Sequence, residues 1–207
     1  MRVLMFAAAL LAAGPALAAE ATYSDPKGRF FFSFPADWPV DAPRALGQDV
    51  ELLVIGGADV DCSWLLLDRP DLASISLASA HLTADQEVAP EQFVSLMRGL
   101  SQADGLQEAR VEQRELNGWS VHLARLSPSP QPVVGVIHLR PGLEVRGICR
   151  SYDGKDRGAE FEKLLLSFGS PRDGEWAAAS AAAAPPPPPS PPVPPEPQAP
   201  PAKKKKP

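Results

Sequence analysis

Residues 133–150, VVGVIHLRPGLEVRGICR, decide the fold. Two apolar runs, Val133 to Leu139 and Leu143 to Arg150, flank the tripeptide Arg140-Pro141-Gly142. Proline presets the backbone for the second position of a tight turn, and glycine tolerates the conformation that follows it. Apolar runs on both sides of such a turn predict an antiparallel β-hairpin.

A second hairpin is predicted just before the first. Leu106 to Leu116 and Trp119 to Leu126 flank Asn117-Gly118, the dipeptide that favours a two-residue turn between antiparallel strands. The segment Ser127 to Pro132 is predicted to be the loop that joins the two hairpins. Together these segments predict a meander of four antiparallel strands.

The register between the two hairpins decides whether two histidines can meet. One register places His122 opposite His138 but puts the apolar side chains of the two strands on different faces. The other places Val121 opposite His138 and Leu123 opposite Val136, so the apolar side chains share one face. A slip of one residue exchanges the buried and exposed faces of a strand. We therefore expect the second register, which separates the histidines and argues against a His122–His138 site.

The remaining elements complete an α+β fold, an antiparallel sheet meander flanked by helices. Apolar side chains at helical spacing predict one helix from Pro90 to Leu100 and another around Phe161 to Phe168. Residues 71–82 suit either a helix or a strand, and both remain open. Three further strands are predicted at Arg29 to Phe34, Val50 to Ile55, and Cys62 to Leu67.

The only two cysteines are Cys62 and Cys149. Strand alternation puts each of them on an apolar face, Cys62 with Trp64 and Leu66, and Cys149 opposite Val134. A disulfide between them and two buried free thiols both fit this pattern. Because the chain has neither Cys-x-x-Cys nor a cysteine close to a histidine, the sequence predicts no metal site.

The first 18 residues have the features of a signal peptide for the Sec pathway. Arg2 precedes an apolar stretch from Val3 to Leu11, and Ala16-Leu17-Ala18 offers the small residues that signal peptidase requires. The apolar stretch is too short to span a bilayer. We therefore expect cleavage after Ala18 and a periplasmic or secreted protein.

The C-terminal residues form a segment of different composition. Alanines and prolines dominate residues 173–207, which end in the cluster Lys203, Lys204, Lys205 and Lys206. Proline-rich chains prefer an extended conformation without a core. The sequence thus predicts a globular domain over residues 19–172 and a disordered tail over 173–207. The lysines are candidates for contact with an anionic envelope polymer.

Charge separates the predicted domain from the tail. The whole chain carries a formal charge of −5. Arg2 contributes one positive charge, and Lys203 to Lys206 with Glu196 contribute a net +3, so the part between them carries −9. An acidic domain repels phosphate, which excludes a nucleic-acid partner.

Three short fragments resemble the PsbP-like superfamily, which includes photosystem PsbP proteins, DcrB-like bacterial envelope proteins and a Ran-binding import factor. These fragments are Phe32-Ser33-Phe34-Pro35 followed by Trp38, then Leu116-Asn117-Gly118, and Phe161-x-x-Leu164-Leu165-x-Ser167-Phe168. The resemblance spans about residues 22–169 and implies an antiparallel sheet flanked by helices. It implies no catalytic residues, since members of the superfamily mostly bind proteins. The cysteines and the proline-rich tail lie outside its pattern.

These observations predict a non-catalytic, cofactor-free binding module of the cell envelope. We expect it to bind a protein or an envelope component through a sheet face or the groove between helix and sheet. Trp38 with Phe30 to Phe34 forms a candidate exposed patch, although core packing of the phenylalanines is the stronger alternative. A second hypothesis is a structural protein that acts through its tail. Enzymatic activity is the weakest hypothesis, because the sequence lacks the nucleophile-elbow, phosphate-loop and dinucleotide-binding motifs.

Overall fold

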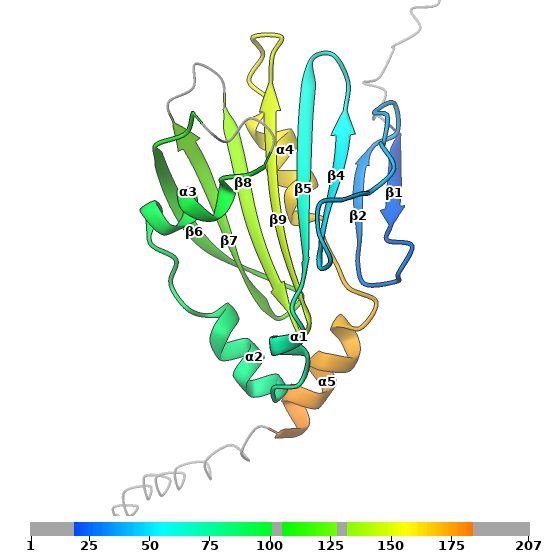
Figure 1. Ribbon diagram of the computed structural model, residues 1–207, viewed down its shortest axis with the longest axis vertical. Coiled ribbons are helices and arrows are strands. Elements are labelled where there is room, and N and C mark those ends of the chain that lie inside the picture. The colour runs from blue at the N-terminus through cyan, green and yellow to red at the C-terminus, as the bar shows by residue number, and fades with distance from the viewer. Residues whose placement is uncertain (1–18, 101–104, 128–131, 184–207) are drawn as a thin grey trace, which may run out of the picture.

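A computed structural model describes residues 19–100, 105–127 and 132–183. Its main element is a seven-stranded antiparallel sheet, in which sequential hairpins lie side by side (Figure 1). The strands follow the spatial order β3 (Arg44–Ala45), β4 (Val50–Gly56), β5 (Val60–Asp68), β9 (Leu143–Ser151), β8 (Val133–Arg140), β7 (Trp119–Ser127) and β6 (Glu108–Leu116). The predicted antiparallel meander is confirmed.

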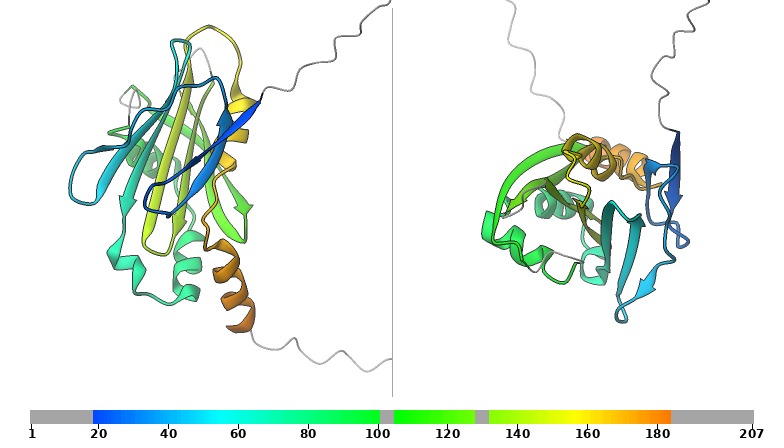
Figure 2. Two further views of the ribbon diagram at one scale, coloured as in Figure 1. Left: turned by 90° about the vertical axis from the view of Figure 1, so that its right-hand side faces the viewer. Right: turned by 90° about the horizontal axis from the view of Figure 1, so that it is seen from above.

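The two faces of this sheet are covered by different elements. Helix α4 (Gly158–Leu166) and the hairpin β1 (Glu20–Ser24) with β2 (Phe31–Pro35) lie on one side. Helix α3 (Pro90–Met97) lies on the other (Figures 1 and 2). Both helices overlap the helices predicted from the apolar spacing, and β1 is an additional strand.

The turns explain why the meander adopts this register. Asn117 and Gly118 have φ angles of 54° and 79°, as a type I′ turn requires at both central positions. Gly142 has φ 78° after Pro141, which suits a type II turn. Val121 lies opposite His138 and Leu123 opposite Val136, so the predicted register is confirmed.

Two apolar clusters fill the space above and below the sheet. The cluster under α4 contains Trp64 and alternate residues of the central strands, together with the inward-facing phenylalanines of β2. The cluster under α3 contains Phe93, Val94 and Met97, which face the opposite side of the same strands. A sheet packed on both faces needs such alternation to place apolar side chains on each side.

Gly147 of β9 provides a test of this packing. It lies opposite Trp64, and a Cβ atom there would lie 2.8 Å from Trp64 Cε3 and 2.8 Å from Leu165 Cδ2. Gly147→Ala is therefore expected to lower the free energy of unfolding by about 1–3 kcal/mol, measured by denaturant titration. The matched control is Gly174→Ala, where a Cβ meets nothing within 4 Å. An equal loss in both variants would contradict the packing described.

Three helices gather at one end of the sheet: α1 (Pro70–Ala73), α2 (Leu77–Ala84) and α5 (Asp173–Ala183). Figure 1 shows α2 and α5 beyond the ends of the strands. Residues 71–82, which suited either a helix or a strand, are thus mainly helical. No helix in the described ranges is long and apolar enough to cross a membrane.

Helix α5 corrects the predicted boundary between domain and tail. The tail was expected to begin at residue 173, but Asp173–Ala183 is helical and Trp176 is buried. Alanine is the best helix former, and Trp176 packs edge-on against Trp119 with a centroid distance of 5.8 Å. The folded unit therefore extends at least to Ala183. The rest of the predicted tail, the signal peptide and most of the Ser127 to Pro132 loop lie outside the described residues.

Candidate functional site

A groove of about 750 Å³ lies between hairpin β1–β2 and helix α4. This volume lies in the range of ligand pockets in proteins. The lining residues come from the start of β1, the end of β2 and one face of α4: Ala19, Glu20, Ser33, Phe34, Pro35, Ala159, Glu160, Lys163, Leu164 and Ser167.

The floor of the groove is apolar because two amphipathic elements meet there. Phe34 continues the inward-facing row of Phe30 and Phe32 along the chain. Leu164 belongs to the apolar stripe of α4 that packs into the same cluster. Phe34 and Leu164 are buried in the core cluster under α4 and also line the groove. An occupant of the groove would therefore contact apolar surface continuous with the core.

The Ser167 hydroxyl at the base of the groove is used in structural hydrogen bonds. Ser167 Oγ accepts a bond from the Ser33 backbone N–H at 2.8 Å and lies 3.0 Å from Ser33 O. It also lies 2.7 Å from the backbone oxygen of Leu164. These contacts attach β2 to the end of α4 and thereby hold the two walls of the groove together.

The rim of the groove carries charge. Lys163 forms an ion pair with Glu20, which joins α4 to β1 at the groove entrance. Glu160 accepts from Arg157 at 3.2 Å. Because the Lys163–Glu20 pair is exposed to solvent, it contributes little to stability and can open at low cost.

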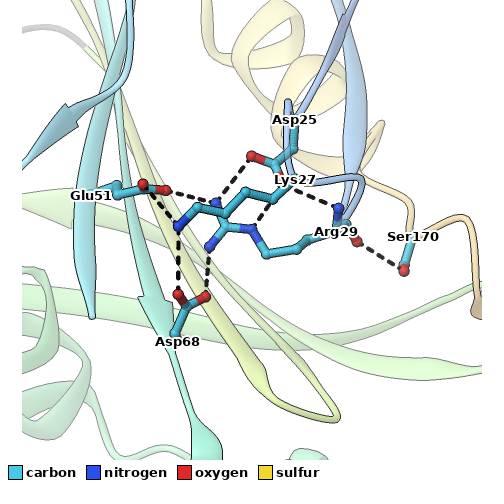
Figure 3. A network of polar contacts seen from close by, with 6 residues as sticks. All are labelled: Asp25, Lys27, Arg29, Glu51, Asp68 and Ser170. Atoms are coloured by element: carbon cyan, nitrogen blue, oxygen red, sulfur yellow. Dashed lines mark hydrogen bonds and ion pairs between the residues drawn. The ribbon is translucent and has the colours of Figure 1, made fainter. Parts of the chain in front are cut away.

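An ionic cluster anchors the turn of hairpin β1–β2 to the main sheet (Figure 3). The Arg29 guanidinium donates to Asp25, Glu51 and Asp68 at distances between 2.6 and 3.0 Å. Lys27 adds an ion pair with Glu51 at 3.0 Å. These contacts link the turn to β4 and to the end of β5, so the hairpin wall of the groove is fixed at its far end.

The pKa shifts in this cluster agree with a structural role. Burial raises the pKa of Asp25, but the hydrogen bonds from Arg29 outweigh it, so the net shift is downward. Burial opposes the charge of Arg29, yet its bonds to the three carboxylates raise its pKa above the usual value. Asp25 and Arg29 are therefore both charged near neutral pH and satisfy each other. Ser170 Oγ also donates to the backbone oxygen of Arg29 at 2.9 Å.

A buried ion pair holds α5 against the sheet. Arg140 Nε donates to Asp173 Oδ1 at 2.7 Å, and the Arg140 side chain is only 1% exposed. Its guanidinium also lies 5.0 Å from the ring of Trp119 and 5.5 Å from that of Phe168. Burial lowers the pKa of Arg140, and the hydrogen bond to Asp173 opposes that shift. This pair explains why the fold continues past residue 172.

The histidines are separated as the register predicted. His138 is fully buried, and its Nε2 donates to the backbone oxygen of Leu165 at 2.8 Å. Burial, with a further contribution from Arg140, lowers the pKa of His138 to about 3, so the ring is neutral at physiological pH. His122 lies on the opposite face, where its Nε2 is 2.9 Å from the backbone oxygen of Gln86. The two rings cannot form one site.

A second hollow lies on the α3 face, in two parts of about 460 and 370 Å³ that both border His122, Glu87 and Val88. Its Thr83 hydroxyl donates to the backbone oxygen of Ser79 at 2.9 Å rather than to His122. Glu144 beside it pairs with Arg69 and with Arg146, the latter at 2.6 Å. These polar groups therefore support the fold.

Cys62 and Cys149 are joined by a disulfide bond. They lie directly opposite each other on β5 and β9, and both are fully buried in the cluster under α4. Of the two alternatives that the sequence left open, the disulfide is present. Because both strands lie in the middle of the sheet, the bond links its β3–β5 part to its β6–β9 part.

Two other predicted sites have different outcomes. For the aromatic residues, the stronger alternative, core packing, is confirmed, and the exposed patch is wrong. Phe30, Phe32 and Phe34 are buried because β2 packs that face against the sheet, and Trp38 packs partly against the same cluster. Phe31, on the opposite side of β2, is 38% exposed. The cluster Lys203 to Lys206 lies outside the described residues and stays a prediction.

Comparison with known proteins finds no matching family profile and no matching curated protein. Among solved structures, a solution structure of cyanobacterial PsbP from Synechocystis sp. PCC 6803 is similar over 76% of this chain and 95% of its own. The identity is 16% and the TM-score 0.47. A crystal structure from Bacteroides thetaiotaomicron is similar over 74% of this chain and 49% of its own, with 10% identity and a TM-score of 0.35. The first of these structures is named PsbP, and three fragments of this sequence resemble the PsbP-like superfamily. Neither structural similarity gives information on function.

Proposed function

We propose that the protein is an exported, non-catalytic binding module of the cell envelope, and that the groove between hairpin β1–β2 and α4 takes an apolar segment of a protein partner. Two features support export. Residues 1–18 have the composition of a cleavable signal peptide. A Cys62–Cys149 disulfide suits an oxidising compartment such as the periplasm or the extracellular space.

The observation that carries the proposal is the composition of the groove. Its floor is built from Phe34 and Leu164, and its rim carries the exposed Lys163–Glu20 pair. An apolar centre within a charged rim is the usual anatomy of a protein interface. The rigid walls favour binding, because the hairpin is fixed by the Arg29 cluster and by Ser167, so little order is lost on association.

The absence of catalysis is supported by the polar groups that line the described cavities. The hydroxyls of Ser167 and Thr83 donate to backbone oxygens, and no histidine is among the described residues that line the groove. A nucleophile needs a base within hydrogen-bond reach. His138 is fully buried in the core, and Cys62 and Cys149 form a disulfide bond, so none of these groups is accessible to a substrate.

A photo-crosslinking experiment tests the groove directly. A benzophenone amino acid is placed at Lys163, which is exposed and lines the groove. Irradiation of intact cells is expected to give an adduct of one discrete mass. Adding Ala159→Trp fills the groove from its exposed wall, so the adduct is expected to fall at least about tenfold, the change produced by about 1.4 kcal/mol of lost binding.

The matched control is Ala178→Trp, which adds the same indole at an exposed position of α5. This variant is expected to leave the adduct unchanged. Equal yields with Ala159→Trp and Ala178→Trp, or no adduct at all from position 163, would refute the groove as the binding site.

A further inference from the structure

Strand β6 (Glu108–Leu116) forms one border of the seven-stranded sheet. Within the described residues it pairs with β7 alone. The other edge of such a strand presents unpaired backbone N–H and C=O groups, which can pair with a further strand. Figure 1 shows β6 at the border of the sheet far from β4.

On one face of this strand four charged residues alternate in sign: Glu108, Arg110, Glu112 and Arg114. A fifth, Glu115, belongs to the other face. The four alternating charges are exposed. Glu112 lies opposite Leu123, a residue of the core cluster under α4, so these charges lie on the α4 face of the sheet.

Two of these four charges form no ion pair within the described part of the chain. Arg110 lies opposite another arginine, Arg125, which is itself paired with Glu162. Arg114 pairs with Glu112 at 2.7 Å. Neither Glu108 nor Arg110 forms an ion pair with a described residue; Glu108 only accepts from Ser127 Oγ at 3.4 Å. Like charges opposite each other destabilise a sheet, so a carboxylate beside Arg110 would be favourable.

We propose that β6 pairs antiparallel with β6 of a second copy of this chain, around a two-fold axis at Val111. In this register Glu108 faces Arg114 of the second copy, and Arg110 faces Glu112 of the second copy. The two-fold symmetry doubles both contacts, so four pairs of opposite charge form across the new edge. The backbone groups of the two edges satisfy each other, as in other additions of a strand to a sheet.

The pattern of charge selects this register over its neighbours. An axis at Arg110 would place Arg110 against Arg110 and Glu108 against Glu112. An axis at Glu112 would place Glu112 against Glu112 and Arg110 against Arg114. Both alternatives bring like charges together. An axis between two residues would pair residues that belong to opposite faces of the sheet. Because opposed residues of paired strands point to the same side, the α4 face of one copy would then continue into the α3 face of the other.

The proposed pairing has a geometric consequence that goes beyond the binding function. A two-fold axis perpendicular to the sheet keeps both α4 faces on the same side. Each dimer would therefore present two grooves toward one surface, and a partner with two copies of its segment could bind both at once.

A charge-exchange series tests the dimer. The sedimentation of the purified mature protein is measured from micromolar to millimolar concentration. The wild type is expected to dimerise, and Arg110→Glu is expected to weaken self-association by at least about tenfold, since it places two carboxylates together at two symmetric positions. Arg110→Glu combined with Glu112→Arg restores opposite charges and is expected to recover the dimer. Arg44→Glu on β3, at the other border of the sheet, makes the same charge change and is expected to have no effect.

Each outcome of the series bears on the proposal. Weaker association with Arg110→Glu, recovery in the double variant and an unchanged Arg44→Glu support it. A wild type that remains monomeric throughout the range overturns it. A dimer that is indifferent to Arg110→Glu, or one that the double exchange does not restore, also overturns it, because such a dimer uses another surface.

Discussion

Asp173→Ala is expected to lower the free energy of unfolding by about 3–5 kcal/mol, because it leaves a buried guanidinium without its counter-ion. Arg140 is 1% exposed and donates to Asp173 from both Nε and Nη2. Asp173 also accepts from the backbone N–H of Ser170 at 3.0 Å, which holds the start of α5. The loss is measured by denaturant titration.

Two variants separate the buried charge from other effects of the substitution. Glu175→Ala removes a carboxylate from the same turn of α5, but its pair with Arg172 is exposed, so at most about 1 kcal/mol is expected to be lost. Arg140→Met combined with Asp173→Leu removes both charges, and this double variant is expected to be more stable than Asp173→Ala. Similar losses for Asp173→Ala and Glu175→Ala would mean that α5 is not docked as described.

Removing the disulfide with Cys62→Ala and Cys149→Ala is expected to lower the free energy of unfolding by about 4–5 kcal/mol. The bond joins residues 87 apart in sequence, and closing a loop of that length reduces the entropy of the unfolded chain by this amount in the chain-entropy account. Both side chains are fully buried, so their truncation adds a small cavity cost.

The single variant Cys149→Ala serves as the control for this prediction. It abolishes the same bond and leaves one thiol in the core, so its loss is expected to match that of the double variant. If the oxidised wild type and the double variant unfold at the same denaturant concentration, the disulfide does not stabilise the fold. Mass spectrometry after alkylation checks that the bond is present in the wild type.

Local patterns in the sequence were sufficient to predict most of the sheet. The turns Asn117-Gly118 and Pro141-Gly142 require backbone conformations that few other residues adopt, so they determine both hairpins. The shared apolar face then selected the register of Val121 and His138, and the structure has that register. The same alternation put Cys62 and Cys149 on apolar faces, but strand order was needed to bring them together.

The end of the fold could not be predicted in the same way, because it depends on contacts distant in sequence. Helix α5 has no apolar stripe, and only Trp176 signals burial. Asp173 holds α5 against the sheet through its ion pair with Arg140, which is 33 residues away in sequence. In the sequence Arg140 belongs to a predicted tight turn, and such turns usually lie at the surface. The residues that line the candidate groove could not be predicted for the same reason, since Phe34 and Leu164 belong to elements at opposite ends of the domain.

Binding by the groove is tested by comparing crosslinking from position 163 in the full chain and in a chain that ends at Ala183. This end point keeps Asp173 and Trp176, whereas a stop at Ser170 would remove both and expose Arg140 and Trp119. Unfolding curves of the two chains should coincide. The same adduct is expected at the same yield from both chains, because the groove belongs to the folded domain. Loss of the adduct on removal of residues 184–207 would contradict this expectation and assign binding to the proline-rich tail and Lys203 to Lys206.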